Sequence, residues 1–485
     1  MSEEALLALC LALPIAGAAL VALLHRWPDL REAASLATAA ALFAAVLTLA
    51  EPVLDGARPA LRLMEILPPL AIAFELEPLG LLFALIASGL WFVSTIYSIG
   101  YMRGNRERHQ TRFFACFALA IGAAIGVAFA GNLLTLYLFY EALTLVTYPL
   151  VTHHGDEEAR NGGRTYLALL LASSILFLLP AIAVTWWLAG TLDFTAGGIL
   201  GGRVSGAAAA GLAALYAFGI GKAALMPIHR WLPAAMVAPT PVSALLHAVA
   251  VVKAGVFSLV KVVVYVFGTG FAAEAFAWLP WAAAFTILAA SIVALRSDNL
   301  KRRLAYSTVS QLAYVVLAAA LLTPLSIVAA ALHIAAHAFG KITLFFAAGA
   351  IYTAAHKTEV SELDGIGRRM PWTLAAFAVG ALSMIGLPPA GGFVSKWYML
   401  QGALQAEQWM PLIVITASTL LNAGYFLPIV YRAFFAGRRA GEAAHGEAHW
   451  TMVLALASTA ALTVLMFFFA DLPLALANRM TGAQP

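Results

Sequence analysis

Charged residues are scarce in this sequence. Asp, Glu, Lys and Arg together make up 11% of its 485 residues, whereas 62% are hydrophobic. In a soluble globular domain about a quarter of the residues are charged, so this composition excludes that class. Apolar runs of about twenty residues recur along the whole chain, and each is long enough to span a bilayer. The sequence therefore predicts an all-α polytopic membrane protein.

Cysteine is almost absent, and so are the motifs that hold cofactors. Cys10 and Cys116 both lie in apolar runs, which excludes a disulfide framework or a cysteine metal site. The segment GIGKAA at 219–224 lacks the upstream glycine and the hydroxyl residue of a phosphate loop. We find no dinucleotide fingerprint, haem motif or iron–sulfur set. We therefore expect no cofactor, and no handling of electrons or nucleotides by this chain itself.

The loop charges predict one topology. We count about fourteen spans, with one sizeable early loop from Glu51 to Glu77. With the N-terminus outside, nineteen Arg and Lys residues fall in inner segments, Arg438 and Arg439 among them. The four that fall outside are Arg58, Arg62, Arg203 and Arg479. This positive-inside bias places both termini on the periplasmic or exterior side. Glu3 and Glu4 replace the basic start of a signal peptide, so we expect a retained first helix.

A small set of titratable residues remains at membrane depth. A charge at a helix centre costs roughly 2.5–3.5 kcal/mol, so such residues indicate a pathway for protons or ions. The set comprises Glu141, Lys222, His247, Lys253, Lys261, His333, His337, Lys341 and Lys396. We expect Lys261 to extend toward the outer end of its helix, in a structural role.

Glu141 is the one acid in the middle of a span, and we expect Lys222 to be its partner. One acid faces several lysines, so some of those lysines must be neutral part of the time. A lysine whose carboxylate partner moves away then becomes a site of proton release. The alternative is a static ion pair that holds two helices together.

His333, His337 and Lys341 are spaced four residues apart, which places them on one face of a helix. Histidine exchanges protons near neutral pH, so the row is typical of a relay. A metal site is one alternative, because two histidines four apart are a ligand spacing, although no carboxylate or cysteine accompanies them. Core histidines bonded to hydroxyls or to the backbone are the other.

Two spans are interrupted next to a lysine. Lys396 follows the segment GLPPAGGFVS, and Lys222 precedes Pro227. Broken helices occur at membrane depth where they line a cavity or are buried in protein. Such a pair in the two halves of the chain indicates an internal repeat.

Four segments together resemble one family. They read KAALMPIHRWLPAAMVAPTPVSALLHAVAVVKAG, LKRRLAYSTVSQLAYV, HIAAHAFGKITLFF and GLPPAGGFVSKWY. They are similar to the proton-translocating antiporter-like subunits of respiratory complex I, of membrane-bound hydrogenases and of Mrp-type Na+/H+ antiporters. The resemblance extends over residues 70–435. It implies fourteen helices with two inverted five-helix repeats that contain broken helices.

The resemblance also implies domains and roles. The domains would be 1–110 for helices one to three, 111–267 and 276–435 for the two repeats, and 436–485 for the last helix. The family's Glu–Lys pair falls on Glu141 and Lys222, and its helix-eight lysine falls on Lys253. Its helix-eleven positions fall on His337 and Lys341, and its carrier falls on Lys396. Together with His247 and His333, these are the candidate transport residues.

Within the family, the sequence is most similar to the MrpD-type component of Mrp antiporters. The carrier is lysine rather than glutamate, and the long C-terminal extension of some relatives is missing. The resemblance then implies a transporter subunit, rather than an enzyme, in a hetero-oligomeric complex of the bacterial inner membrane that exchanges H+ for Na+ or another monovalent cation. One alternative is a proton-pumping, chain 2-like subunit of complex I or of a related hydrogenase. Another is a membrane anchor without transport.

Overall fold

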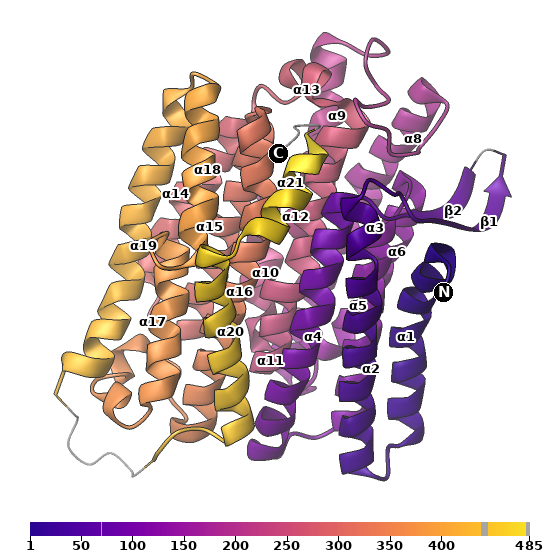
Figure 1. Ribbon diagram of the computed structural model, residues 1–485. Helices are drawn as coiled ribbons and strands as arrows, with labels where there is room; N and C mark the ends of the chain where they lie inside the picture. The colour runs from indigo at the N-terminus through magenta and orange to yellow at the C-terminus, as the bar shows by residue number, and fades with distance from the viewer. Residues whose placement is uncertain (69, 438–444, 482–485) are drawn as a thin grey trace.

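The structure, a computed structural model, describes residues 1–68, 70–437 and 445–481. Arg438 and Arg439, assigned above to an inner loop, lie outside the described residues. The described chain forms a bundle of long helices that run roughly side by side (Figure 1). Eleven helices in these ranges are long and apolar enough to cross a membrane. The predicted all-α polytopic fold is confirmed.

The N-terminal part contains an unexpected β-hairpin. Its elements are α1 (Glu3–Leu23), α2 (Pro28–Thr48), α3 (Ala50–Leu54), β1 (Ala60–Leu67), β2 (Leu70–Glu75) and α4 (Pro78–Gly104). The antiparallel strands lie within the predicted early loop, and irregularities in their register obscure the alternation that would have marked them. The side chains of Asn132 and Thr135 hydrogen-bond the backbone of β2 at Ala71 and Ala73. These bonds fix the hairpin to the beginning of the helix Leu133–Val151 (α6).

The first half of the bundle contains the first broken helix. Its long elements are α5 (Gln110–Phe129), α6 (Leu133–Val151), α7 (Glu157–Ser173), α8 (Leu179–Ala189), α9 (Gly206–Gly219) and α12 (Val251–Lys261). Its short ones are η1 (Ser174–Leu178), η2 (Gly221–Ala223), η3 (Ile228–Arg230), α10 (Trp231–Ala234), η4 (Ala235–Val237), α11 (Thr240–Ala244), η5 (Leu245–Val249) and η6 (Val262–Phe267). The break begins after α9, at Ile220, and so includes Lys222, whereas it was predicted at Pro227, after that lysine. The span from α11 to η6 contains two π-helical turns, η5 and η6.

The second half contains the second break. Its elements are α13 (Thr269–Ala275), α14 (Leu279–Arg296), α15 (Leu300–Ala320), α16 (Pro324–Ala355), η7 (Val360–Glu362), η8 (Ile366–Arg368), α17 (Pro371–Ile385), α18 (Gly391–Gln405) and α19 (Trp409–Phe435). Two further helices follow, α20 (Trp450–Phe468) and α21 (Asp471–Met480). Helix α17 ends at Gly386, whose φ of 89° is left-handed and is readily adopted by glycine. Pro388 and Pro389 then separate α17 from α18, as predicted.

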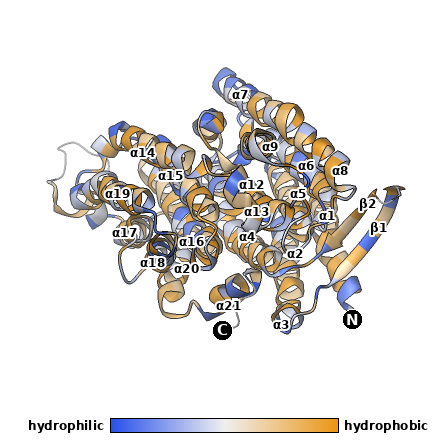
Figure 2. Ribbon diagram, turned by 90° about the horizontal axis from the view of Figure 1, so that it is seen from above, coloured by the Kyte–Doolittle hydropathy of each residue, from blue (hydrophilic) through white to orange (hydrophobic). Residues whose placement is uncertain are grey.

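Burial separates central helices from peripheral ones. In the most apolar 18-residue window of each span, every residue is buried in the span 240–267, and 94% are buried in α16. The corresponding share is 33% in α1. Viewed from above, hydrophobic colour predominates on peripheral helices such as α6 and α8, whereas α12 lies inside the array (Figure 2). The titratable residues of α12 and α16 therefore lie within protein, away from lipid.

Exposed tryptophans mark both ends of the bundle. Trp27, Trp372 and Trp450 are exposed at the beginnings of α2, α17 and α20, and Trp187, Trp281 and Trp409 are exposed near the end of α8 and at the beginnings of α14 and α19. Indole rings are enriched at the two membrane–water interfaces, where an apolar body and a polar N–H are both satisfied. The two groups therefore indicate where the bilayer surfaces lie.

Candidate functional site: a buried row of lysines and histidines

Lys222 lies in the turn η2, just after α9 ends, and is fully buried. Its Nζ donates to the carbonyl oxygen of Tyr140 at 2.7 Å and to Thr144 Oγ1 at 2.6 Å. The same Nζ lies 3.2 Å from the centroid of the Tyr140 ring, a cation–π contact. The Tyr140 hydroxyl accepts the backbone N–H of Lys222 at 3.0 Å. Both the main chain and the side chain of Lys222 are thus fixed to α6.

The predicted direct pair between Glu141 and Lys222 is not formed. Among the described residues, no ion pair within 4.0 Å joins them. Successive residues of a helix are turned by about 100°, so Tyr140 and Thr144 face the ammonium while Glu141 is turned away. Glu141 Oε1 is buried without a hydrogen-bond partner. Glu141 is thus next in sequence to a residue that binds the ammonium, and its carboxylate keeps an acceptor oxygen open.

Replacing Glu141 by glutamine tests whether this open carboxylate matters. The amide keeps the shape but removes the charge beside Lys222, so we expect transport to fall at least about tenfold, equivalent to about 1.4 kcal/mol, with assembly unchanged. Glu157→Gln, on the exposed first turn of α7, is the matched control. Proton flux in vesicles that contain the assembled complex is the measurement. Wild-type flux in Glu141→Gln would count against a role for this acid.

Lys253 and His337 form a direct contact between the two halves. Lys253 Nζ lies 2.5 Å from His337 Nδ1, and both side chains are fully buried. Either group can accept in this contact, because a neutral amine and a neutral ring nitrogen each offer a lone pair. The proton can therefore reside on either side without movement of the helices α12 and α16. His337 Nε2 is buried without a partner.

His247 lies close to this contact but outside its hydrogen bonds. It occupies the π-helical turn η5, and its ring packs against Phe345 with 4.7 Å between ring centroids. Neither of its ring nitrogens has a hydrogen-bond partner. Like the Glu141 carboxylate oxygen Oε1, the ring nitrogens of His247 are therefore buried without a partner.

His333 is held from both sides. Its Nδ1 lies 2.8 Å from Ser395 Oγ, and its Nε2 lies 3.0 Å from Gln311 Oε1. Its ring centroid is 6.2 Å from that of His337. Sequence reasoning missed Gln311, although an amide in the apolar run of α15 was a detectable signal. Ser395 immediately precedes Lys396 in the chain, so this hydrogen bond joins His333 to the residue next to Lys396.

Lys341 points toward α15 rather than along its own helix. Its Nζ donates to Ser307 Oγ at 2.7 Å and to the carbonyl oxygen of Leu304 at 3.3 Å. The predicted row on α16 therefore consists of two histidine rings near each other and a lysine that turns to the neighbouring helix. Ser307 was also missed by the sequence analysis.

Lys396 occupies the second break and is 4% exposed. Its Nζ donates to the carbonyl oxygens of Met384 at 3.0 Å and Ile385 at 2.8 Å, and lies 3.4 Å from Thr419 Oγ1. These carbonyls end α17, so they lack helical partners and carry the negative end of the helix dipole. A Cβ at Gly386 would lie 2.5 Å from Lys396 Cδ, so glycine is also required here for space. The break between α17 and α18 thus forms the binding site of the Lys396 ammonium.

Lys261, predicted to extend toward the outer end of its helix, is the last residue of α12 and contacts protein rather than water there. It is 1% exposed, and its Nζ lies 3.3 Å from Glu77 Oε1. Glu77 Oε2 also accepts the hydroxyl of Tyr265 at 3.0 Å, and Lys261 Nζ donates to the carbonyl oxygen of Ala130 at 2.7 Å. The expected structural role is therefore achieved through a buried ion pair that fixes α12 to the start of α4.

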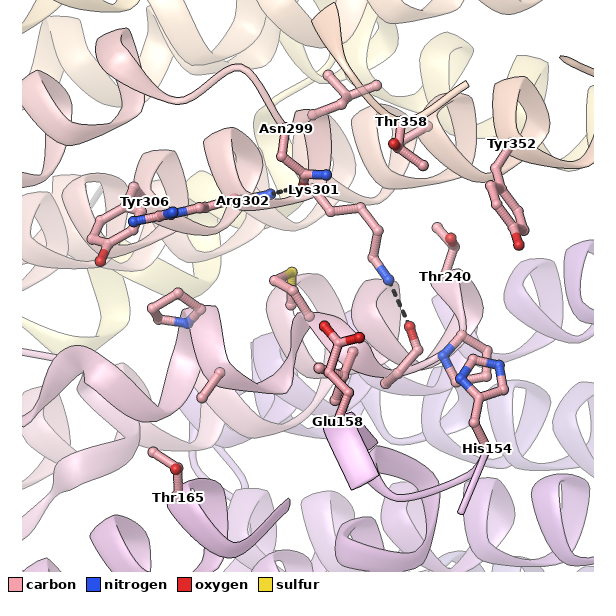
Figure 3. Close-up of a pocket in the computed structure, with 18 of the residues that line it drawn as sticks. His154, Glu158, Thr165, Thr240, Asn299, Lys301, Arg302, Tyr306, Tyr352 and Thr358 are labelled. Carbon is pink, nitrogen blue, oxygen red and sulfur yellow. Dashed lines mark hydrogen bonds between the residues drawn. The ribbon is translucent and has the colours of Figure 1, made fainter. Parts of the chain in front are cut away.

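A large cavity of about 1190 Å³ opens at the opposite end of the bundle, between α7, α10, α15 and α16. Figure 3 shows Lys301 reaching across it to the carbonyl oxygen of Ala238, a contact of 2.6 Å, with Glu158 and His154 nearby. Thr240, at the start of α11, and Ala348, on α16, also line it. Each lies seven residues from a buried titratable group, His247 or Lys341, which is about 10 Å along a helix.

Two adjacent histidines, His154 at the cavity wall and the buried His153 next to it, have pKa values displaced in opposite directions. A hydrogen bond with Glu107 raises the pKa of His154, whose Nε2 lies 3.5 Å from Glu107 Oε1. Burial lowers the pKa of the adjacent His153 to about 4. His154 thus keeps its proton to higher pH than an unperturbed histidine, whereas His153 is neutral across the physiological range. The cavity mouth therefore carries an exchangeable proton site.

These features define a class: a polytopic membrane protein with two broken helices, each holding a buried lysine, and further titratable residues between them. Residues 130–422 match the family described as NADH:quinone oxidoreductase/Mrp antiporter, TM. Residues 69–114 match the N-terminal family of complex I chain 5. The chain belongs to this family of antiporter-like membrane subunits, which confirms the resemblance.

Individual relatives come from both branches of the family. NADH-quinone oxidoreductase subunit N of Desulforudis audaxviator is 35% identical over 376 residues, which are 76% of this chain and 74% of that protein. A probable A/B component of a K(+)/H(+) antiporter from Rhizobium meliloti is 32% identical over 76% of this chain and 37% of its own length. Several relatives are thus considerably longer than the matched region.

Solved structures share the fold. A chain of the Mrp complex from Dietzia sp. has a TM-score of 0.88 at 21% identity, and the match covers 99% of this chain and 97% of that one. A chain of an archaeal membrane-bound sulfane sulfur reductase has a TM-score of 0.85 at 23% identity with the same coverage. At this level of identity the likeness establishes the fold alone.

Proposed function

We propose that this chain is a proton-translocating subunit of a multi-subunit antiporter that exchanges H+ for Na+ or another monovalent cation. The observation that carries the proposal is the buried contact between Lys253 and His337, which joins titratable residues of the two halves. Lys222 belongs to the same half of the chain as Lys253, and His333, Lys341 and Lys396 belong to the same half as His337. Burying so many titratable groups in a membrane is costly, and ion pathways are where such groups occur.

The roles follow from the contacts. Glu141 and Lys222 form the first exchange site, because Glu141 has an open carboxylate oxygen and its neighbours on α6, Tyr140 and Thr144, bind the ammonium. Lys253 and His337 pass the proton between the halves, with His247 beside them. Lys396 is the terminal carrier, held by carbonyls that accept a charged or a neutral amine. The large cavity lined by Lys301 and Glu158 is the mouth on the inner side.

The proposal includes an orientation and a domain division. We place the chain in a bacterial inner membrane with both termini on the periplasmic side, because the loop charges favour that topology. We divide it into 1–110, 111–267, 276–435 and 436–485. The two middle units each contain one helix break with a lysine. Partner subunits are expected because the Dietzia structure and the K(+)/H(+) relative are parts of assemblies by name.

Cysteine labelling tests the orientation. Ala273 on α13 and Arg296 at the end of α14 are exposed and lie at opposite ends of the latter span, whereas Arg303 is buried and unsuited to labelling. In a background with Cys10 and Cys116 replaced by serine, a membrane-impermeant maleimide applied to whole cells is expected to label Ala273→Cys but not Arg296→Cys. Lysis is expected to expose the second site. Labelling of both in intact cells would contradict the topology.

A second candidate function has its own support. The 35% identity to subunit N of a quinone oxidoreductase favours a proton-pumping subunit of a redox complex. Purification of the native complex separates the two, because the antiporter predicts other membrane antiporter subunits as partners and the pump predicts flavin and iron–sulfur subunits. Proton flux driven by a Na+ or K+ gradient in vesicles tests the antiporter directly. An assembled complex without flux, either under a cation gradient or with an electron donor supplied, would leave only the membrane-anchor alternative.

A further inference from the structure

Two buried polar residues of α19 take no part in the row described above. Tyr425 and Asn422 are both fully buried, and the Tyr425 hydroxyl lies 2.5 Å from Asn422 Oδ1 and 3.0 Å from Ser307 Oγ. Asn422 Nδ2 donates to the carbonyl oxygen of Met384 at 3.0 Å. Ser307 is the residue that binds Lys341, and Met384 is one of the residues that bind Lys396. A continuous set of hydrogen bonds therefore connects the two lysines.

The chemistry of the groups fixes the direction of these bonds. Because Asn422 Nδ2 donates to a carbonyl, its Oδ1 faces Tyr425 and can only accept. The Tyr425 hydroxyl has one proton and two acceptors within reach, Asn422 Oδ1 and Ser307 Oγ. Ser307 Oγ also accepts from Lys341, so the two donors compete for that oxygen. The amide of Asn422 does not pass a proton onward. The set transmits polarisation rather than protons.

The Met384 carbonyl is where this polarisation acts. Its oxygen accepts from Lys396 Nζ at 3.0 Å, from Asn422 Nδ2 at 3.0 Å and from Gln311 Nε2 at 3.3 Å. A carbonyl oxygen has two lone pairs, so three donors compete for it. A charged Lys341 donates more strongly to Ser307 Oγ, which leaves that oxygen a weaker acceptor for the Tyr425 hydroxyl. The Tyr425 proton then bonds Asn422 Oδ1 and polarises its amide. Asn422 then becomes a stronger competitor, and Lys396 is held less firmly.

We propose that Asn422 and Tyr425 are positioning residues. They couple the charge of Lys341 to the strength of the hydrogen bonds that hold Lys396 at the α17–α18 break. A proton that arrives at Lys341 loosens Lys396 from Met384, which leaves the Ile385 carbonyl as its main acceptor at 2.8 Å. The carrier is thus released when the preceding site is loaded. This inference rests on the proposed transport function of Lys341 and Lys396.

The test uses the purified complex with its partner subunits in vesicles, with flux expressed per assembled complex. Tyr425→Phe removes one hydroxyl and keeps the ring, and Asn422→Leu removes the amide at similar volume. We expect each to lower proton flux roughly five- to tenfold, the size expected when a hydrogen bond of a charged network is lost. Tyr216→Phe is the matched control, because Tyr216 is also buried and bonds a single hydroxyl, Thr185, at 2.7 Å. The control is expected to transport like the wild type.

The proton flux of the double variant at Tyr425 and Asn422 is the decisive measurement. If Tyr425 and Asn422 act through one set of bonds, Tyr425→Phe combined with Asn422→Leu is no worse than either alone. Multiplicative losses would show independent packing roles and overturn the coupling. Should Asn422→Leu fail to assemble, Ser307→Ala replaces it in the same cycle. Wild-type flux in Tyr425→Phe with lost flux in Lys396→Ala overturns this inference alone, whereas wild-type flux in both overturns the proposed function.

Discussion

Lys396→Ala is expected to abolish coupled transport while the complex still assembles. Alanine leaves the carbonyls of Met384 and Ile385 at the end of α17 without the ammonium that they now bind. The carrier site then has no group that takes up or releases a proton. Proton and cation flux in vesicles is the measurement. Lys396→Met, which keeps most of the volume of the side chain, controls for loss of packing and is expected to be equally inactive.

The arginine variant at the same position separates a carrier from a fixed charge. Lys396→Arg keeps the positive charge, but a guanidinium does not release its proton in a protein. We therefore expect no more than about 1% of wild-type flux, a barrier higher by about 2.7 kcal/mol or more. Lys396→Glu keeps a titratable group and is expected to retain more activity than the arginine variant. If Lys396→Arg transports like the wild type, Lys396 acts as an electrostatic fixture and is not the carrier.

Lys253→Met is expected to have an effect of similar size. The methionine fills the volume but cannot exchange a proton with His337 Nδ1, so the first and second halves lose their direct contact. We expect flux to fall about a hundredfold, again about 2.7 kcal/mol.

Ser258→Ala is the matched control for Lys253→Met. Ser258 lies on the same helix, α12, and its hydroxyl bonds the carbonyl oxygen of Ala254 at 2.6 Å, an ordinary bond within a helix. Substantial flux in Lys253→Met, measured with the same assembled complex, would mean that protons cross between the halves by another route.

The presence of both helix breaks could be predicted from the sequence, and so could the buried titratable residues. Pro388 and Pro389 cannot continue a helix wherever the surrounding helices lie, so the break is a local property. Lysines and histidines are conspicuous in apolar runs because burial makes them costly. Both signals are read from short segments, without knowledge of the packing.

The partners of these residues could not be predicted in the same way. Which carbonyl or hydroxyl meets a lysine depends on the rotation of a separate helix about its axis, and one residue of error turns a side chain by about 100°. This is why Lys222 meets Tyr140 and Thr144 instead of Glu141, and why Glu77 was missed as the partner of Lys261. Uncharged polar residues such as Asn422 are common enough in membrane helices that spacing alone did not single them out.

The length of α16 has a consequence for the lipid around the protein. Its 32 residues extend about 48 Å at 1.5 Å per residue, whereas the hydrocarbon core of a bilayer is about 30 Å thick. A helix that faces lipid accommodates such a mismatch by tilting. Helix α16 is enclosed by neighbouring helices, so the lipid does not meet its extra length. The lipid is matched instead by shorter peripheral helices such as α1, whose 21 residues extend about 32 Å. The surplus turns of α16 therefore lie beyond the hydrocarbon core without any strain on the bilayer.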